Sequence, residues 1–264
     1  MATLVFFHAH PDDESIQTGG TMARAAAEGH RVVLVVATKG EHGEVADGFL
    51  ADGETLWQRR TRETAASAEV LGVVRVEYLG YVDSGMMDTP ENDAPDSFWQ
   101  ADVENAARRL AGILDEERAD VLTLYDEHGG YGHPDHIQVH RVGERAAELA
   151  GVEKAYMATI NRDALIRIMA AGRESGLIPD DADTPDIEGS DLGVPESRIT
   201  TTVDVSEYVM KKRASMAAHA SQISDTHFFL AMPDEVFRMG FGNEWFIRVG
   251  APEGTVDEFF AGLE

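Results

Sequence analysis

The segment TLVFFHAHPDDES, residues 3–15, joins a short apolar run to a dense group of acidic and imidazole side chains. A continuous apolar run of this length, without polar alternation, is typical of a strand that is buried on both faces of a parallel sheet. The polar residues that follow it belong at the carboxyl end of that strand. We therefore predict a strand over residues 3–8 and a functional loop directly after it.

Short runs rich in valine and leucine recur along the chain and alternate with longer amphipathic stretches. This alternation predicts repeated β–α units, because each amphipathic helix can cover one face of a parallel sheet. The predicted strands are 3–8, 31–38, 74–79, 120–125, 154–160, 199–203 and 244–249, and the predicted helices are 16–29, 55–71, 98–117, one that begins near Asp135, and 206–219. The expected fold class is α/β: a Rossmann-like, doubly wound, mostly parallel sheet with a C-terminal α+β extension.

The composition excludes several classes of protein. The 264 residues carry a formal net charge of -26, whereas a protein that neutralises nucleic-acid phosphates needs a concentrated basic surface. The apolar run at the N-terminus is too short for a signal peptide or a membrane span. We expect a cytoplasmic protein that binds neither nucleic acid nor a membrane. Because the chain has no cysteine, a metal ion would have to be held by histidine and carboxylate side chains.

A second group of acidic and imidazole side chains, YGHPDH at residues 131–136, follows the predicted strand 120–125. In a doubly wound sheet the first and fourth strands commonly lie side by side where the strand order reverses, and ligands bind at their carboxyl ends. The topology therefore brings this group together with the one that follows the first strand.

The two loops offer the donors of a catalytic metal site. Such a site commonly has three ligands from histidine and carboxylate and keeps one position open, and His10, Asp13 and His136 supply that set. His140 lies one helical turn after His136 and could complete an H-x-x-x-H pair, which is the alternative for one ligand. The metal is expected to be Zn2+, although a site of this chemistry also accepts other divalent transition metals.

The remaining polar residues of the two loops suggest acid–base chemistry beside the metal. Asp12 is the expected general base, and His133 is the expected acid or electrostatic stabiliser, with Asp135 as the partner that orients His133. The structural alternative is that both loops are ordinary turns in which the aspartates cap helix N-termini. No glycine-rich dinucleotide or phosphate motif and no G-x-S-x-G nucleophile motif occurs.

Two motifs, HAHPDDES at residues 8–15 and GGYGHPDH at residues 129–136, resemble the signatures of the LmbE-like, or PIG-L, family of zinc-dependent N-acetylglucosaminyl deacetylases. Weaker similarities extend over most of the chain: Gly40 to Gly43, Arg60 to Glu63, Tyr78 to Met86 and Ala218 to Gln222. The resemblance implies the same metal ligands, His10, Asp13 and His136, and the same general base, Asp12.

The resemblance also implies roles that the residues alone do not give. Tyr131 matches a mobile tyrosine that helps to stabilise the oxyanion, Arg60 and Asp83 match positions that contact the sugar, and His219 matches a histidine near the site. The implied function is hydrolysis of the amide on an amino-sugar nitrogen, with a small-molecule substrate. The alternatives are a mycothiol S-conjugate amidase, which the tail from His227 to Val249 resembles more closely, and a non-catalytic metal-binding or sugar-binding protein.

The chain is expected to divide into three parts. Residues 1–175 form the Rossmann-like, metal-binding catalytic domain. Residues 176–197, rich in Asp, Gly, Ser and Pro, form an acidic loop or insertion, because they have little apolar surface to bury. Residues 198–264 form a C-terminal part that packs on the same domain.

Overall fold

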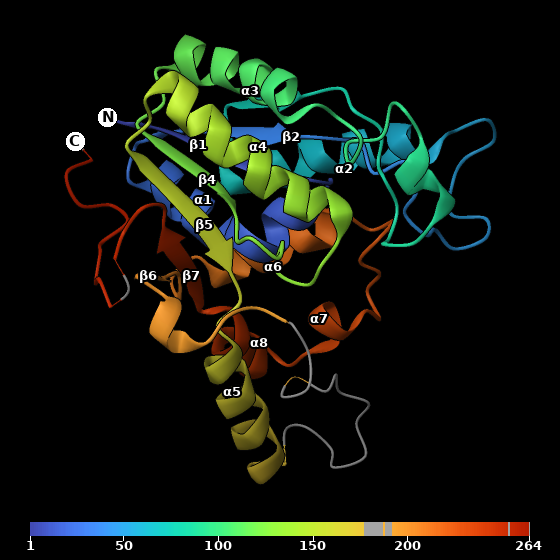
Figure 1. Cartoon of the computed structure of the whole chain (residues 1–264). Coiled ribbons are helices and arrows are strands. Elements are labelled where there is room, and N and C mark those ends of the chain that lie inside the picture. The colour runs from blue at the N-terminus through green and yellow to red at the C-terminus, as the bar shows by residue number, and fades with distance from the viewer. Residues whose placement is uncertain (177–186, 188–191, 253, 264) are drawn as a thin grey trace.

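A single seven-stranded sheet in the order β3-β2-β1-β4-β5-β7-β6 forms the centre of the computed structural model, which describes residues 1–176, 187, 192–252 and 254–263 (Figure 1). The strands are β1 Thr3–His8, β2 Arg31–Val36, β3 Arg75–Tyr78, β4 Val121–Tyr125, β5 Lys154–Thr159, β6 Thr201–Asp204 and β7 Asn243–Arg248. Strands β1 to β5 pair in parallel, and β7 pairs antiparallel with both β5 and β6. The predicted fold class is confirmed, including the position of β1 beside β4.

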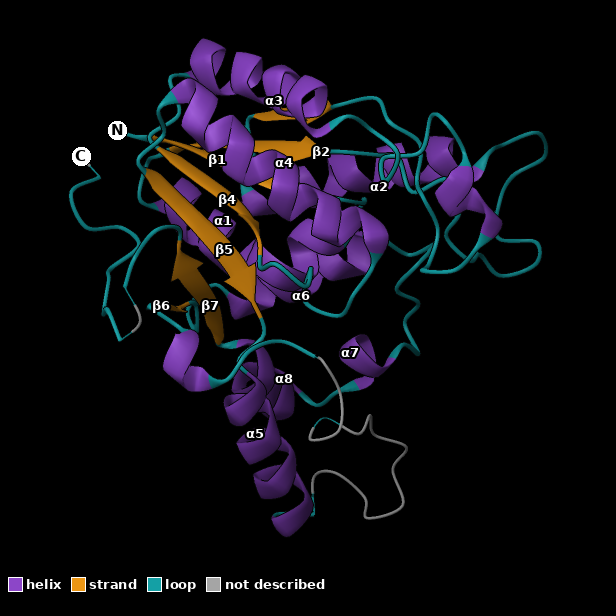
Figure 2. Ribbon diagram, viewed as in Figure 1, coloured by secondary structure: helices purple, strands orange, loops and turns teal. Residues whose placement is uncertain are grey.

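Helices cover both faces of this sheet. They are α1 Gly19–Ala27, α2 Leu56–Leu71, α3 Val103–Glu117, α4 Pro134–Ala150, α5 Arg162–Glu174, α6 Val209–Ala218, α7 Phe228–Ala231 and α8 Asp234–Phe241, with short η turns at Glu14–Thr18, Pro90–Asp93 and Glu196–Arg198. Helices α3 and α4 pack together on one face, and α1, α2 and α6 pack together on the other. Helices α5, α7 and α8 gather beside the tip of β5 (Figure 2).

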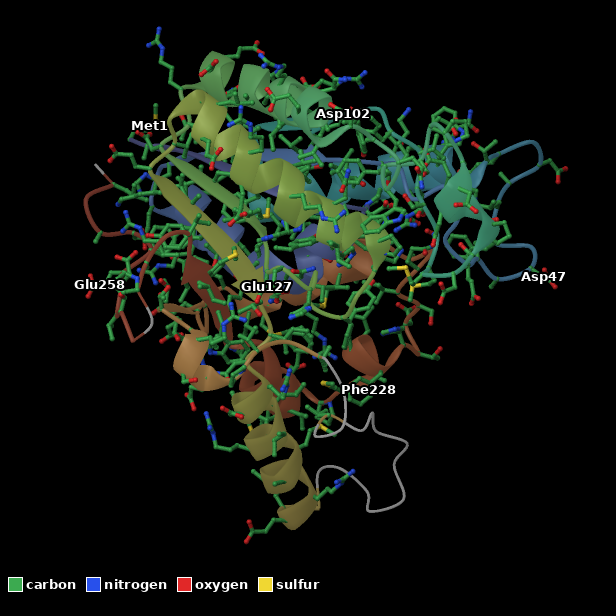
Figure 3. All side chains as sticks on the ribbon, in the orientation of Figure 1. Met1, Asp47, Asp102, Glu127, Phe228 and Glu258 are labelled. Atoms are coloured by element: carbon green, nitrogen blue, oxygen red, sulfur yellow. The ribbon has the colours of Figure 1, made fainter. Side chains whose placement is uncertain are left out.

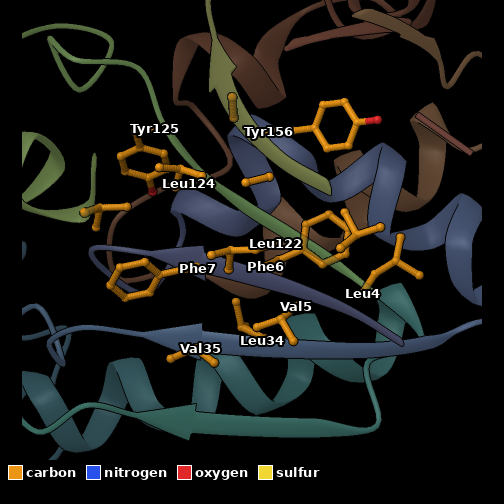
Figure 4. Close-up of a cluster of buried hydrophobic side chains, with 14 of the residues drawn as sticks. Leu4, Val5, Phe6, Phe7, Leu34, Val35, Leu122, Leu124, Tyr125 and Tyr156 are labelled. Carbon is orange, nitrogen blue, oxygen red and sulfur yellow. The ribbon is translucent and has the colours of Figure 1, made fainter. Parts of the chain in front are cut away.

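The apolar run of β1 lies at the middle of the core. Leu4, Val5, Phe6 and Phe7 are fully buried and pack between the equally buried side chains of β2 and β4 (Figure 4). Burial of each such side chain contributes roughly 1.5–3 kcal/mol to folding. The strand that carries the first polar loop is therefore held firmly, and the loop leaves it from a fixed point.

The observed elements differ from the predicted ones in several places. The predicted helix 16–29 is divided into a π-helical turn, Glu14–Thr18, and the helix α1. The predicted helix 98–117 begins only at Val103, where the Asp102 side chain accepts a hydrogen bond from the backbone N–H of Asn105 and caps the helix. Helices α5, α7 and α8 were not predicted, and the predicted helix 206–219 begins at Val209.

The C-terminal strands β6 and β7 extend the sheet that the earlier strands form. The predicted acidic loop, 176–197, lies largely outside the described residues. Among the helices that the structure describes, none is long and apolar enough to cross a membrane.

Candidate metal centre

The two polar loops meet at the carboxyl ends of β1 and β4, as the strand order predicted. The His10 ring centroid lies 4.6 Å from that of His133 and 5.3 Å from that of His136. His133 is the N-cap residue of α4, and Pro134 occupies the first turn, so the start of this helix carries both imidazoles into the site. The side chains of His10, His133 and His136 are buried.

The geometry around Asp13 fits a bound metal ion. Its Oδ2 atom lies 3.4 Å from His10 Nδ1 and 3.3 Å from His136 Nε2. Two ligands of a tetrahedral metal, each roughly 2.0–2.1 Å from the ion, are about 3.3–3.4 Å apart. Two of the spacings among the predicted ligands, those from Asp13 to each imidazole, therefore match what a zinc ion requires.

The protonation of His136 gives a second argument for a cation. Its Nδ1 lies 3.1 Å from the carbonyl oxygen of Gly129, and because a carbonyl can only accept, Nδ1 must carry the proton. In the neutral ring the buried Nε2 then has a lone pair that faces Asp13, and it has no hydrogen-bond partner among the described residues. A lone pair facing a carboxylate oxygen is unfavourable unless a cation lies between them.

Electrostatics keep Asp13 ready to act as a ligand. Burial alone would raise its pKa, but His136 and His10 hold the pKa of Asp13 well below its ordinary value. Burial would likewise lower the pKa of His10, but the carboxylates of Asp83, Asp13 and Asp135 raise it well above its usual value. The ring of His10 is thus surrounded by negative charge that a metal cation would neutralise.

Two groups of side chains among the described residues bring possible ligand atoms within 4.8 Å of one another. They are His10 with His133 and His136, and His10 with Asp83 and Asp135. His10 belongs to both groups. His133 is thus a further donor within reach, with only Nε2 free, because its Nδ1 accepts a hydrogen bond of 3.1 Å from the backbone N–H of Asp135.

The contacts of Asp135 correct the role expected for it. Its Oδ2 lies 3.0 Å from His10 Nε2, and its carboxylate also accepts hydrogen bonds from the backbone N–H and the hydroxyl of Ser84. The carboxylate therefore orients His10 and not His133. The hydrogen bond between Asp135 and His133 comes from the backbone N–H of Asp135.

Asp12 lies beside the candidate ligands in an unusual conformation. Its φ angle is +101°, a region that a residue with a Cβ rarely adopts. Arg60 Nη2 lies 3.3 Å from its Oδ1. Burial raises the pKa of Asp12 to about 6, against the opposing effect of Arg60, which places this carboxyl group in the range of a general base that works near neutral pH.

The structure places Arg60 behind Asp12. Its side chain is buried, and it donates hydrogen bonds to the carbonyl oxygens of Gly40 and Pro11. A Cβ atom at Gly40 or Gly43 would overlap the guanidinium group or its immediate surroundings, which explains the two glycines in this motif. The buried guanidinium group therefore donates its hydrogen bonds to backbone carbonyls around Asp12. Arg60 also lines the cavity.

Asp83 and His219 are the other residues expected to contact the substrate, and only Asp83 lines the cavity. Asp83 lines the cavity, and its Oδ1 lies 3.4 Å from His10 Nε2. Burial would raise the pKa of Asp83, but His10 and the backbone N–H of Gly85 lower it far below its ordinary value. His219 is fully buried, lies 2.6 Å from Glu14 and is not among the cavity residues, so its position does not allow the direct sugar contact expected of it.

Tyr131 and His133 lie at the edge of the same site. The Tyr131 ring is half exposed and its centroid is 4.9 Å from that of His136. Burial, together with His10 and His136, lowers the pKa of His133 to about 3. His133 is therefore neutral, and since Nδ1 accepts a hydrogen bond, Nε2 carries the proton and can donate to an oxyanion.

His140 does not belong to the site. Its Nδ1 lies 3.0 Å from the carbonyl oxygen of Tyr125, and its Nε2 lies 3.5 Å from Glu144. The possible H-x-x-x-H pair with His136 is therefore wrong.

Sequence reasoning gave no role to Glu14. Its carboxylate is fully buried and accepts a hydrogen bond from the backbone N–H of Asp12.

A cavity of about 930 Å³ opens next to these groups. His10, Asp12, Asp13, Tyr131 and His133 line one part of it. The remaining wall is mostly apolar and comes largely from the helices beside the tip of β5, near Phe228, which Figure 3 labels, with further residues from the turn Glu14–Thr18 and from β7. It includes Ile16, Leu165, Ile168, Phe229, Val236 and Trp245.

Comparisons with known proteins show which family the chain belongs to. A family model described as PIG-L, GlcNAc-PI de-N-acetylase, matches residues 5–147, which include both polar loops. A 1D-myo-inositol 2-acetamido-2-deoxy-alpha-D-glucopyranoside deacetylase of Acidothermus cellulolyticus is 40% identical over 278 residues, covering 99% of this chain and 95% of the relative.

Solved structures share the fold at lower identity. A deacetylase of the teicoplanin biosynthesis pathway is 17% identical with a TM-score of 0.62, covering 95% of this chain and 100% of that one. GalB, the 4-carboxy-2-hydroxymuconate hydratase of Pseudomonas putida, is 18% identical with a TM-score of 0.60, covering 97% and 99%. Since these two proteins differ in reaction, the fold alone does not assign one.

Proposed function

The chain belongs to the PIG-L family, and from this premise we propose that it is a metal-dependent deacetylase that hydrolyses the amide on the nitrogen of an amino sugar. The substrate proposed first is the one that its relatives are named for, 1D-myo-inositol 2-acetamido-2-deoxy-alpha-D-glucopyranoside. The observation that carries the proposal is the placement of Asp12 beside a candidate metal centre at the end of a large cavity.

The metal ion that we propose is Zn2+, held by His10, Asp13 and His136. When bound there, such an ion would supply Lewis-acid chemistry, which polarises an amide carbonyl and lowers the pKa of water. His10 receives its orientation from Asp135, because a hydrogen bond to the second nitrogen fixes the ring that binds through the first.

The chain's own residues then divide the proton transfers and the charge stabilisation. Asp12 removes a proton from the attacking water and can later deliver one to the leaving amine. Arg60 keeps the Asp12 carboxyl group in place through its contacts with the surrounding loop. His133 donates from Nε2 to the oxygen that gains negative charge, and Tyr131 can reach the same oxygen from the mouth of the cavity.

The apolar wall of the cavity favours a second candidate, a related amidase whose substrate carries an apolar group. A disaccharide of glucosamine and inositol has hydroxyl groups on most of its carbons, and these cannot form hydrogen bonds with side chains such as Leu165, Phe229 and Val236. A mycothiol S-conjugate or a longer N-acyl chain would bury apolar surface there. A non-catalytic binding protein is less consistent with the site, because binding alone needs no carboxylate in a strained conformation at position 12.

A substrate panel separates these candidates. We expect the purified, metal-loaded protein to release a free amine from 1D-myo-inositol 2-acetamido-2-deoxy-alpha-D-glucopyranoside, and kcat/KM is compared with that for longer N-acyl analogues and for a thiol S-conjugate. A higher kcat/KM for the apolar substrates would favour the second candidate. Release of no amine from any of these amides would exclude both.

Replacement of Asp135 by asparagine is expected to weaken metal binding. Loss of the negative charge makes His10 a poorer ligand, and the loss of such an outer partner typically costs about 10–100-fold in metal affinity. Competition with a chelator of known affinity measures the change. If kcat fell while the metal affinity stayed at the wild-type value, Asp135 would serve His133 instead, as the sequence first suggested.

A further inference from the structure

The main chain at Asp12 adopts a conformation that is rare for any residue other than glycine. A non-glycine residue with a φ of +101° persists only where its surroundings over-determine it. Three groups surround it. The backbone N–H and the hydroxyl of Ser15 both donate to the carbonyl oxygen of Asp12, at 3.0 and 2.7 Å. Arg60 lies beside the Asp12 carboxylate. Glu14 accepts a hydrogen bond of 3.0 Å from the backbone N–H of Asp12.

Glu14 is itself fixed from two sides. Its Oε1 accepts a hydrogen bond of 2.6 Å from the hydroxyl of Ser67 and lies 2.6 Å from His219 Nε2, while its Oε2 accepts the N–H of Asp12. Ser67 belongs to α2, and His219 follows the last residue of α6. Glu14, Ser67 and His219 are fully buried, so the carboxylate joins two packed helices to the loop of the general base.

This arrangement has no role in contacting the substrate. Neither Glu14 nor Ser67 nor His219 is among the residues that line the cavity. A buried carboxylate is unfavourable unless all its oxygens have partners, and each partner here lies on a different segment of the chain. The contact that distinguishes Glu14 from an ordinary buried group is the one to the backbone of Asp12.

We propose that Glu14 is a positioning residue for the general base: fixed by Ser67 and His219, its carboxylate holds the main chain of Asp12 in the positive-φ conformation and so directs the Asp12 carboxyl group into the cavity. This inference rests on the proposed function, in which Asp12 is the base. It gives His219 and Ser67 a part in catalysis that acts entirely through Glu14.

The test uses Glu14→Gln in the full-length, metal-loaded protein. The amide group of glutamine has one oxygen that accepts and one NH2 group that only donates, so it cannot accept from Asp12 on one side and from Ser67 and His219 on the other. We expect kcat for the preferred amide to fall about 10–100-fold, because a small displacement of a reacting group costs about that much, while KM and metal content stay unchanged. Ser67→Ala, which removes one bond and leaves the carboxylate, is expected to lower kcat about tenfold or less.

Glu63→Gln is the matched control. Glu63 is a buried carboxylate on the same helix as Ser67, and it accepts hydrogen bonds of 2.9 and 2.6 Å from the backbone N–H and the hydroxyl of Ser221. It also connects α2 to the segment after α6, but it does not contact Asp12. We expect this variant to lower the unfolding temperature and to retain the wild-type kcat.

The results separate this inference from the proposed function. If Glu14→Gln and Ser67→Ala both keep the wild-type kcat while Asp12→Asn is inactive, only the positioning role is overturned. A loss of metal from Glu14→Gln in proportion to its loss of activity overturns it too, since Glu14 would then act through Asp13. Should Glu14→Gln fail to fold, Ser67→Ala decides: a lower kcat with unchanged KM and metal content supports the role, and an unchanged kcat contradicts it. Absence of amide hydrolysis by the wild-type protein overturns the proposed function instead.

Discussion

Replacement of Asp12 by alanine or asparagine is expected to abolish turnover and to leave the metal in place. Asp12 is the proposed base, and loss of a positioned general base typically costs about 10²–10⁴-fold in rate. It is not needed as a ligand, because His10, Asp13 and His136 already present three donor atoms. Elemental analysis of the purified variants, beside kcat from amine release, checks both halves of the expectation.

Asparagine is the more informative of the two substitutions, because it keeps the shape of the side chain and tolerates positive φ better than alanine does. A matched control exists at Asp88, which also has a positive φ, +68°, and is not among the cavity residues. We expect Asp88→Ala to retain the wild-type kcat. Loss of the metal from Asp12→Asn would instead identify Asp12 as a ligand and would leave the reaction without the base assigned here.

The sheet, and the meeting of the two polar loops at its edge, could be predicted from the sequence. A strand that is buried on both faces needs a continuous run of apolar residues, and such runs are easy to recognise. Strand β1 was predicted with the bounds that the structure has, since every position from Leu4 to His8 is buried and has to suit that environment. The position of β1 beside β4 follows from the chain topology of doubly wound sheets. Helix α5 left no such record, because Ala164 and Gly172 are its only residues described as buried.

The partners of the site residues could not be predicted in the same way. Asp135 was assigned to His133 because the two are neighbours in sequence, but its carboxylate contacts His10, 125 residues away along the chain. The bond between Glu14 and His219 spans 205 residues. Contacts of this separation depend on how the loops leave the sheet, and no local pattern encodes them. Residue type therefore indicated the candidate site, and only the structure shows which carboxylate contacts which imidazole.

These partners show that the side chains of residues 10–14 point in different directions and contact different parts of the structure. His10 and Asp13 face the candidate metal, Asp12 faces the cavity, and Glu14 faces the helices behind the loop. Four side chains that follow one another so closely can point in these directions only if the main chain turns sharply. The positive φ of Asp12 and the π-helical turn that begins at Glu14 produce that change of direction.

Replacement of His136 by glutamine is expected to remove the metal and the activity together. Within the part of the chain that the structure describes, His136 Nε2 has no hydrogen-bond partner to replace a metal, and Asp13 would lose the imidazole that lies opposite it. Because a bound metal stabilises the folded state, we expect Zn2+ to raise the unfolding temperature of the metal-free wild-type protein and not that of this variant. His140→Gln is the control, since His140 lies on the same helix but contacts Tyr125 and Glu144, and it should keep both metal and turnover. A His136→Gln protein with a full complement of metal would show that the ion lies elsewhere, and the three-ligand site proposed here would be wrong.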